Sequence, residues 1–62
     1  MESPTPEEII DARKKSSKSQ TEAAAVIYCS LGAWQKWELG KRTMHPAFFE
    51  LFKIKTIANG RN

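Results

Sequence analysis

Helix-start signals recur at short intervals along this chain of 62 residues. Thr5 precedes Pro6 and lies three residues before Glu8, which is the pattern of an N-cap, a proline at the first helical position and a capping-box partner. Ser19 and Glu22 repeat the capping box. No stretch of the sequence shows a strand pattern. The sequence therefore predicts a domain built from helices alone.

Further signals divide the rest of the chain. Ser30 is a third N-cap, and Gly40 follows nine residues of helical pattern as a C-terminal stop. Pro46 opens a fourth segment. We therefore predict a compact all-α fold of four short helices joined by tight turns, with helices over about 6–16, 20–28, 31–39 and 46–58.

Length and composition narrow the class of protein. Sixty-two residues form one domain, 1–62, with 1–4 and 60–62 expected to be frayed. One cysteine, Cys29, excludes a disulfide scaffold, and one histidine, His45, leaves too few ligands for a metal site. No set of nucleophile, base and orienting acid is visible. We expect no enzyme activity, catalytic residue, metal, cofactor or small-molecule ligand.

The charge is distributed unevenly. The net charge is +3, but residues 1–11 hold four acids and no base, so the remaining chain is strongly basic. A basic body suggests a polyanion, usually nucleic acid, although an ordinary solvated surface explains this charge equally well. The longest apolar run, Ala23 to Cys29, is too short for a membrane span, and no secretory signal is visible. We expect a cytoplasmic protein with no membrane partner.

The third predicted helix has two different faces. At 100° per residue, Trp34, Trp37 and Glu38 share one face with Ser30, while Lys36 points the opposite way. The paired tryptophans are expected in the core rather than as stacking platforms. The predicted core of the first three helices consists of Ile9, Ala12, Ala24, Ile27, Trp34 and Trp37.

An ordered set of residues resembles a known family. The set is Ser19-Gln20, Ala23-Ala24, Ser30, Trp34, Trp37-Glu38, Gly40 and Arg42. Over residues 9–46 it is similar to the Cro/repressor (XRE-type) helix-turn-helix DNA-binding family, which implies a lambda-repressor-like fold. Tyr28 departs from the family, which has glycine in the turn, and Lys18 stands where the family has an apolar residue. Either Tyr28 bears the strain of a positive φ or the turn is built differently.

The resemblance implies roles for individual residues. The third helix would enter the major groove, and its base-reading residues would be Leu31, Gly32, Ala33, Gln35 and Lys36. Contacts to phosphate or backbone would come from Gln20, Ser30, Lys41 and Arg42. Three alternatives stay open: Gln20 as a capping-box spacer, Lys36 as a solvated lysine, and Leu31 packed against the second helix. Arg13 and Glu38, at inward family positions, are expected to form a partly buried ion pair joining the first and third helices.

The fourth predicted helix carries more apolar residues than one stripe needs. Phe49 and Phe52, with part of Ile54, are expected to complete the core. The contact of a homodimer is expected at Phe48, Leu51, Phe52 and Lys55. His45 is expected to cap or pack at this helix, and Cys29 to be a small buried hydrophobe.

Together these features predict a function. We expect a sequence-specific binder of double-stranded DNA, a phage or bacterial Cro-like repressor. It would bind a pseudo-palindromic operator as a dimer, in the cytoplasm and nucleoid of a bacterial host. The alternative is a helix-turn-helix protein-interaction module that docks a partner through the fourth helix without binding DNA. Salt-dependent binding to duplex DNA would separate the two.

Overall fold

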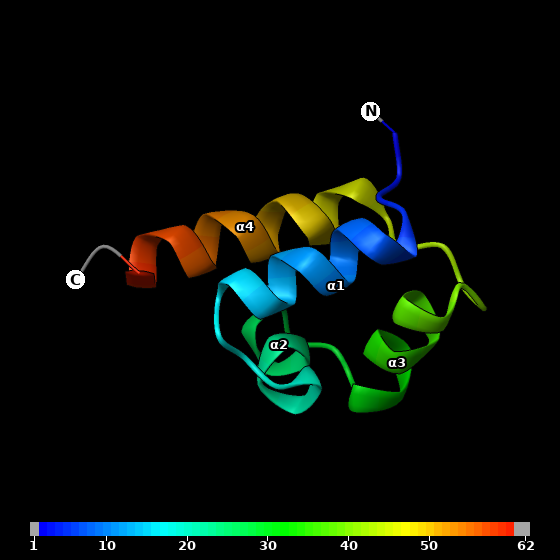
Figure 1. Ribbon diagram of the computed structural model, residues 1–62, viewed down its shortest axis with the longest axis horizontal. Helices are drawn as coiled ribbons and strands as arrows, with labels where there is room; N and C mark the ends of the chain where they lie inside the picture. Colours follow the sequence, from blue (N-terminus) through cyan, green and yellow to red (C-terminus); the bar gives the residue numbers. More distant parts are fainter. Residues whose placement is uncertain (1, 61–62) are drawn as a thin grey trace.

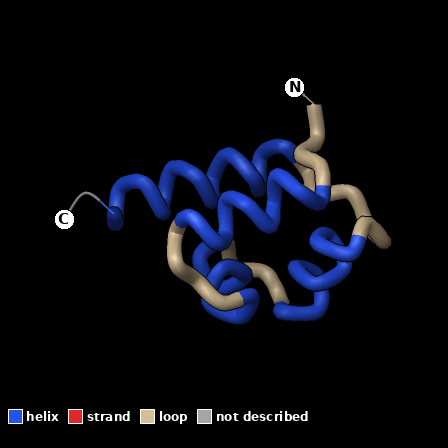
Figure 2. Tube along the Cα trace, in the orientation of Figure 1, coloured by secondary structure: helices blue, strands red, loops and turns tan. Residues whose placement is uncertain are grey.

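The computed structural model describes residues 2–60, with side chains through Ile57, as four α-helices (Figure 1). These are α1 (Pro6–Lys15), α2 (Gln20–Val26), α3 (Leu31–Leu39) and α4 (Pro46–Gly60). Short loops join them, and the described residues contain no strand (Figure 2). The predicted all-α four-helix fold is confirmed. Met1 and residues 61–62, which belong to the predicted frayed ends, lie outside the described part.

The helices form two layers. α1 and α4 run in the same general direction along one side of the molecule, and α2 and α3 lie on the other side (Figure 1). α3 packs against both α2 and α1, whereas α4 packs mainly against α2. This arrangement places α3 at the edge of the domain and leaves one of its faces free.

The helix starts lie where the caps predicted them. The Thr5 hydroxyl accepts the Glu8 N–H at 3.1 Å, and the Glu8 carboxylate accepts the Thr5 N–H at 2.8 Å. The same reciprocal pair joins Ser19 and Glu22. The Ser30 hydroxyl accepts the Ala33 N–H at 3.1 Å and starts α3. All three predicted N-caps are therefore confirmed.

The first three helices end in the same way. A residue with positive φ follows each helix: Ser17 (58°), Tyr28 (62°) and Gly40 (78°). The next N–H in the chain then bonds back to a carbonyl of the last turn, as Lys18 to Arg13, Cys29 to Ala24 and Lys41 to Lys36. This is the Schellman arrangement. It ends α1 at Lys15 and α2 at Val26, slightly before the predicted boundaries at 16 and 28.

The fourth helix and the N-terminal lead-in differ from expectation. α4 continues to Gly60 instead of ending at 58, a shift within the one or two residues by which helix ends vary. Pro4 is buried, so the predicted frayed segment 1–4 contributes a packed residue.

The core gathers around Trp34. Its indole ring lies 5.9 Å from the Trp37 ring and 5.0 Å from the Phe52 ring, between centroids. Ala12, predicted as core, is only partly buried and packs against this cluster, whereas Ala23 and Met44 are fully buried and were not predicted. The buried cluster is Ile9, Ala23, Ala24, Ile27, Trp34, Trp37, Met44 and Phe52.

A positional signal accounts for Met44. It directly precedes His45, whose Nδ1 accepts the Ala47 N–H at 3.0 Å and caps α4 as predicted. An apolar residue just before an N-cap commonly packs against the fourth residue of the helix, here Phe49, as a hydrophobic staple. Pro4 and Ile9 stand at the same two positions around the start of α1, and both are buried.

Candidate nucleic-acid interface

A hydrogen-bonded cluster centred on Glu38 locks three helices together. The Arg13 guanidinium donates to both Glu38 carboxylate oxygens, from Nε at 2.6 Å and from its second terminal nitrogen at 3.2 Å. The Trp34 indole N–H donates to Glu38 at 2.6 Å, and the Gln20 amide donates at 2.9 Å. Arg13 also donates to the Lys18 carbonyl. The predicted Arg13–Glu38 ion pair is confirmed, and it fixes α3 against α1 and the start of α2.

The surroundings of Glu38 keep its carboxylate charged. Its side chain is only 6% exposed. Burial alone raises its pKa, but hydrogen bonds from Arg13, Trp34 and Gln20, with the Arg13 charge, outweigh burial and lower the pKa below the ordinary 4.5. A buried charge with this many donors is well satisfied, so the cluster sets the orientation of α3 firmly.

The outward face of α3 matches the predicted reading face. Trp34 and Trp37 are buried, whereas Gln35 and Lys36 are exposed on the opposite side. Leu31 is 40% exposed and therefore partly covered, so the alternative in which it packs against α2 stays open. Ala33 is partly buried and packs against the core. The base contacts of all these residues stay predictions.

Gly32 is exposed near the start of α3, and no side chain covers the backbone at this position. A Cβ built at Gly32 would meet nothing nearer than the Ser30 hydroxyl at 4.0 Å. Packing within the chain therefore does not require glycine here. Gly32 is the second residue of α3, so its cost relative to alanine is less than the about 0.5–1 kcal/mol of a helix interior. The missing side chain does allow another molecule to approach the α3 backbone closely.

A basic loop continues from the end of α3. Gly40 turns the chain, and the N–H groups of Lys41 and Arg42 both point back to the Lys36 carbonyl, at 2.9 and 3.3 Å. The side chains of Lys41 and Arg42 are exposed. The two residues predicted to contact phosphate thus follow directly after α3.

The other two predicted backbone contacts have structural roles. Ser30 caps α3. Gln20 is half-buried and its amide donates to Glu38, a role that differs both from the predicted phosphate contact and from a mere capping-box spacer. The inward-facing acid at Glu38 was the available signal, because a carboxylate with four acceptor positions can take more donors than one arginine supplies. A phosphate contact by Gln20 stays a prediction.

The predicted dimer contact on α4 needs correction. Phe52 is 0% exposed and packs against Trp34, so its assignment to a dimer surface is wrong. Leu51 is half-buried against the core. Phe48 is 40% exposed, with its ring 5.9 Å from the Trp37 ring, and stays a candidate. Ile54, expected to contribute to the core, is 59% exposed. The expectation that Phe52 completes the core is confirmed, and a side chain that is fully buried in the core cannot also lie on a dimer surface.

Lys55 has a role inside the chain. Its ammonium group donates to the Val26 carbonyl at 3.2 Å and to the Tyr28 hydroxyl at 2.6 Å. A hydrogen bond from Lys55, with its charge, lowers the pKa of Tyr28. Lys55 thus ties α4 to the last turn of α2, where a cation also suits the helix dipole. Tyr28 has a φ of 62°. Of the two alternatives for this turn, the structure therefore shows the one in which Tyr28 bears the strain of a positive φ.

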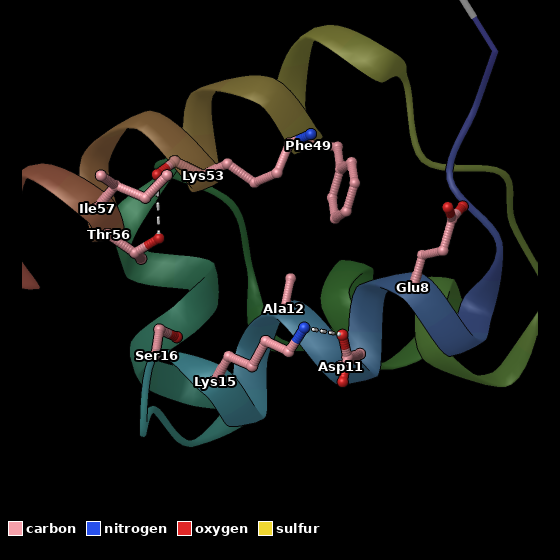
Figure 3. Close-up of a pocket in the computed structure, with 9 residues that line it drawn as sticks. All are labelled: Glu8, Asp11, Ala12, Lys15, Ser16, Phe49, Lys53, Thr56 and Ile57. Carbon is pink, nitrogen blue, oxygen red and sulfur yellow. Dashed lines mark hydrogen bonds and ion pairs between the residues drawn. The ribbon is translucent and has the colours of Figure 1, made fainter.

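A groove of about 570 Å³ runs between α1 and α4 (Figure 3). Ala12 and Phe49 form its floor, and Lys53 reaches over the Phe49 ring, 4.7 Å from its centroid. Asp11 and Lys15 form an exposed ion pair on the α1 rim, at 3.0 Å. The residues that line the groove come from α1, α4 and Ser16 directly after α1, and none comes from α3.

Cys29 was expected to be buried, and the structure confirms this only in part. Cys29 is half-buried rather than fully buried, and burial raises the pKa of its thiol. A raised thiol pKa reduces the fraction of reactive thiolate. No group of three or more potential metal ligands occurs within the described residues. In the same part of the chain, no helix is long and apolar enough to cross a membrane.

The four-helix fold, in which the hydrogen bonds of Glu38 hold α3 in place, is a small helix-turn-helix domain with one exposed face on α3. No model of a known protein family matches the chain. The chain is similar to the type II methyltransferase M.MspI from Moraxella sp, with 40% identity over 43 residues. That stretch is 69% of this chain but 10% of the methyltransferase, so the chain spans about a tenth of its relative's length.

Proposed function

We propose that this chain binds double-stranded DNA sequence-specifically through α3 and acts as a transcriptional regulator, a Cro-like repressor of phage or bacterial type. One observation carries the proposal. α3 is fixed from behind by Glu38 and buries Trp34, while Gln35 and Lys36 face outward. A major groove admits an α-helix, and amide and ammonium groups are suited to base edges there. The basic loop after α3 supports the proposal, since cations add affinity for phosphate.

The partner would be an operator with two related half-sites. One helix of nine residues contacts few base pairs, so two copies on a pseudo-palindrome would supply the needed specificity. Repression would then follow from covering promoter DNA. Such a protein would work in the cytoplasm, at the nucleoid of a bacterial host. The methyltransferase activity of the relative is not proposed here, because the shared stretch is a tenth of that enzyme.

A comparison of one lysine variant with one arginine variant tests the proposal. Lys36→Ala should change which bases are preferred, whereas Arg42→Ala should weaken binding to all duplexes alike. Binding-site selection from a random duplex pool, followed by affinity measurements at several salt concentrations, would separate the two effects. Lys15→Ala is a control with the same charge change, since Lys15 lies at the α1–α4 groove and should affect binding little. Equal base preference and equal loss in Lys36→Ala and Arg42→Ala would refute the assigned roles.

A protein-interaction module is the second candidate. Ile54 and Ile57, each 59% exposed on α4, favour it, because large exposed apolar side chains often mark contact surfaces. A module of this kind would show no salt-dependent affinity for duplex DNA.

A further inference from the structure

The outward face of α3 is largely apolar. Its exposed residues are Leu31, Gly32, Gln35, Lys36 and Leu39, and at 100° per residue they cover about 140° of the helix. Only Gln35 and Lys36 carry polar side chains. Hydrogen bonds from side chains to a base edge are therefore limited to these two positions, and the two leucines suit a different chemical group.

The charges around this face indicate which molecule would cover it. Lys36 is exposed on α3, and Lys41 and Arg42 are exposed in the loop that follows. The one acid of α3, Glu38, faces inward and is bonded to Arg13. An apolar face with cations beside it and no free acid is complementary to duplex DNA, whose major groove presents base edges between two rows of phosphates.

An apolar side chain in the major groove has one kind of favourable partner. All base pairs present hydrogen-bonding groups there, but thymine also presents the methyl group on its C5 atom. 5-Methylcytosine carries the same methyl group on the same atom. A leucine against this methyl group buries apolar surface, whereas a leucine against a polar edge removes water from groups that it cannot bond. An exposed leucine in the groove therefore favours a pyrimidine with a C5-methyl group.

Leu31 is the leucine best placed for this contact. It is the first residue of α3, directly after the cap Ser30, and the N-terminal residues of a recognition helix are the ones that contact base edges. Its side chain is 40% exposed, so the chain already holds it in part and it loses less freedom on binding. A Cβ at the neighbouring Gly32 would meet only the Ser30 hydroxyl, at 4.0 Å. The missing side chain leaves room for a methyl group beside Leu31.

We propose that Leu31 reads the C5-methyl group of a pyrimidine in the operator, so that affinity depends on whether this methyl group is present. The inference rests on the proposed function, because it names what one position of α3 recognises. Each methyl group should raise affinity about fourfold, the effect of burying one group of this size. Methylation of a cytosine at this position then strengthens binding, and a thymine supplies the same contact without methylation.

Duplexes that differ by one methyl group test the proposal. In one half-site of the duplex found by binding-site selection, each pyrimidine is replaced in turn by thymine or uracil opposite adenine, and by 5-methylcytosine or cytosine opposite guanine. We expect one position at which the wild type prefers thymine to uracil, and 5-methylcytosine to cytosine, each by about fourfold. A preference within only one of these two pairs identifies that base as the source of the methyl group.

Three leucine variants locate the contact. Leu31→Ala should lose the methyl preference, and Leu31→Met, which keeps a long apolar side chain, should retain most of it. Leu39→Ala is the matched control, because it makes the same substitution on the same face about 12 Å further along α3. It should keep the full preference. The ratio of affinities for the two duplexes of a pair is compared, so a general loss of binding cancels, and circular dichroism checks that the helices remain.

Several results would overturn the proposal. Equal affinity of the wild type for the two duplexes of every pair would refute it and leave the proposed function intact. A methyl preference that persists in Leu31→Ala, or that disappears in Leu39→Ala, would assign the contact to a residue other than Leu31. If no duplex is selected and none binds with salt-dependent affinity, the proposed function fails and this inference fails with it.

Discussion

Glycine at position 32 is unfavourable for the helix that contains it. The residue lies in the exposed part of α3, and no neighbouring atom of the chain excludes a Cβ there. No packing contact within the domain therefore offsets the cost of glycine in this helix. If DNA binds α3 as proposed, the missing side chain lets the α3 backbone approach it closely.

Gly32→Ala should separate stability from binding. We expect the free energy of unfolding to rise by at most about 0.5 kcal/mol, because alanine favours a helix over glycine but this preference is weaker in the first turn, where position 32 lies. We expect affinity for the selected duplex to fall by about tenfold, which corresponds to about 1.4 kcal/mol, since the Cβ holds the backbone away from the base edges. Urea unfolding and a duplex titration measure the two effects. Higher stability with unchanged affinity would indicate that the groove does not approach this part of α3.

Tyr28 shows strain that only a backbone angle reveals. Its φ of 62° is in the left-handed region, where a residue with a Cβ costs about 1–2 kcal/mol. Its side chain is exposed and bonds to Lys55, an exposed contact that contributes little. The free-energy cost of the positive φ should therefore exceed the stabilisation from the contact between Tyr28 and Lys55.

Tyr28→Gly should stabilise the domain by about 1 kcal/mol, because glycine adopts this angle without a steric cost. Tyr28→Phe is the matched control: it keeps the strained angle, removes the hydroxyl bond to Lys55, and should change stability by less than about 0.5 kcal/mol. Urea unfolding of the three proteins tests this. A glycine variant less stable than the phenylalanine variant would show that the tyrosine ring contributes more than its exposure indicates.

At the scale of the helices, the position of α3 depends on the carboxylate of Glu38. Glu38 is bonded to Arg13 of α1, Gln20 of α2 and Trp34 of its own helix. Losing one partner of a buried pair typically costs about 3–5 kcal/mol, because the remaining charge is stranded. A domain of this size has little more stability than that in total. Protonation of Glu38 should therefore weaken the whole arrangement.

The pH dependence follows from the lowered pKa of Glu38. A carboxyl whose pKa is lower in the folded than in the unfolded chain contributes stability that is complete above about 4.5 and is lost as the pH falls through the folded value. We expect the Trp34 indole N–H resonance to shift with a midpoint below 4.5, since this group donates to Glu38. The Trp37 indole serves as the control and should move much less. A Trp34 midpoint above the ordinary glutamate pKa would contradict the assigned direction.

The sequence was most informative where structure is local. Thr5, Ser19 and Ser30 cap their helices as predicted, because each cap involves residues only three positions apart. The Arg13–Glu38 pair followed from the family resemblance and not from spacing. The core position of Phe52 was predicted, but the exposure of Ile54 was not, because it depends on how α4 lies against the rest of the domain, which a helical period cannot determine. The Gln20 contact with Glu38 required the same three-dimensional information.

At the scale of the whole molecule, acidic residues stand at the start of α1, while exposed basic residues occur both on α1 and α4 and on α3 with its following loop. The acids Glu7 and Glu8 stand in the first turn of α1, where they favour the helix dipole. Lys36, Lys41 and Arg42 are exposed on α3 and the following loop. A polyanion would therefore meet the basic part of a molecule whose net charge is only +3.

Binding of DNA should raise the thermal stability of the domain. A ligand that binds only the folded chain adds about 2.7 kcal/mol at one hundred times its dissociation constant. In a domain of this size that corresponds to a rise of roughly 10 °C or more in Tm. Thermal unfolding with a selected duplex at low salt measures it, and added salt should reduce the rise. A scrambled duplex is the control, and equal Tm with and without the selected duplex would argue for the interaction module.

The Schellman ends and capping boxes also bear on how fast the chain folds. Each ends or starts a helix through bonds between residues at most five positions apart, so these boundaries can form before distant parts of the chain meet. Helical domains dominated by such short-range bonds fold in microseconds to milliseconds. We expect contacts between distant residues, such as Arg13 with Glu38 and Lys55 with Val26, to form after these boundaries. An unfolded chain would regain its exposed α3 face within about that time.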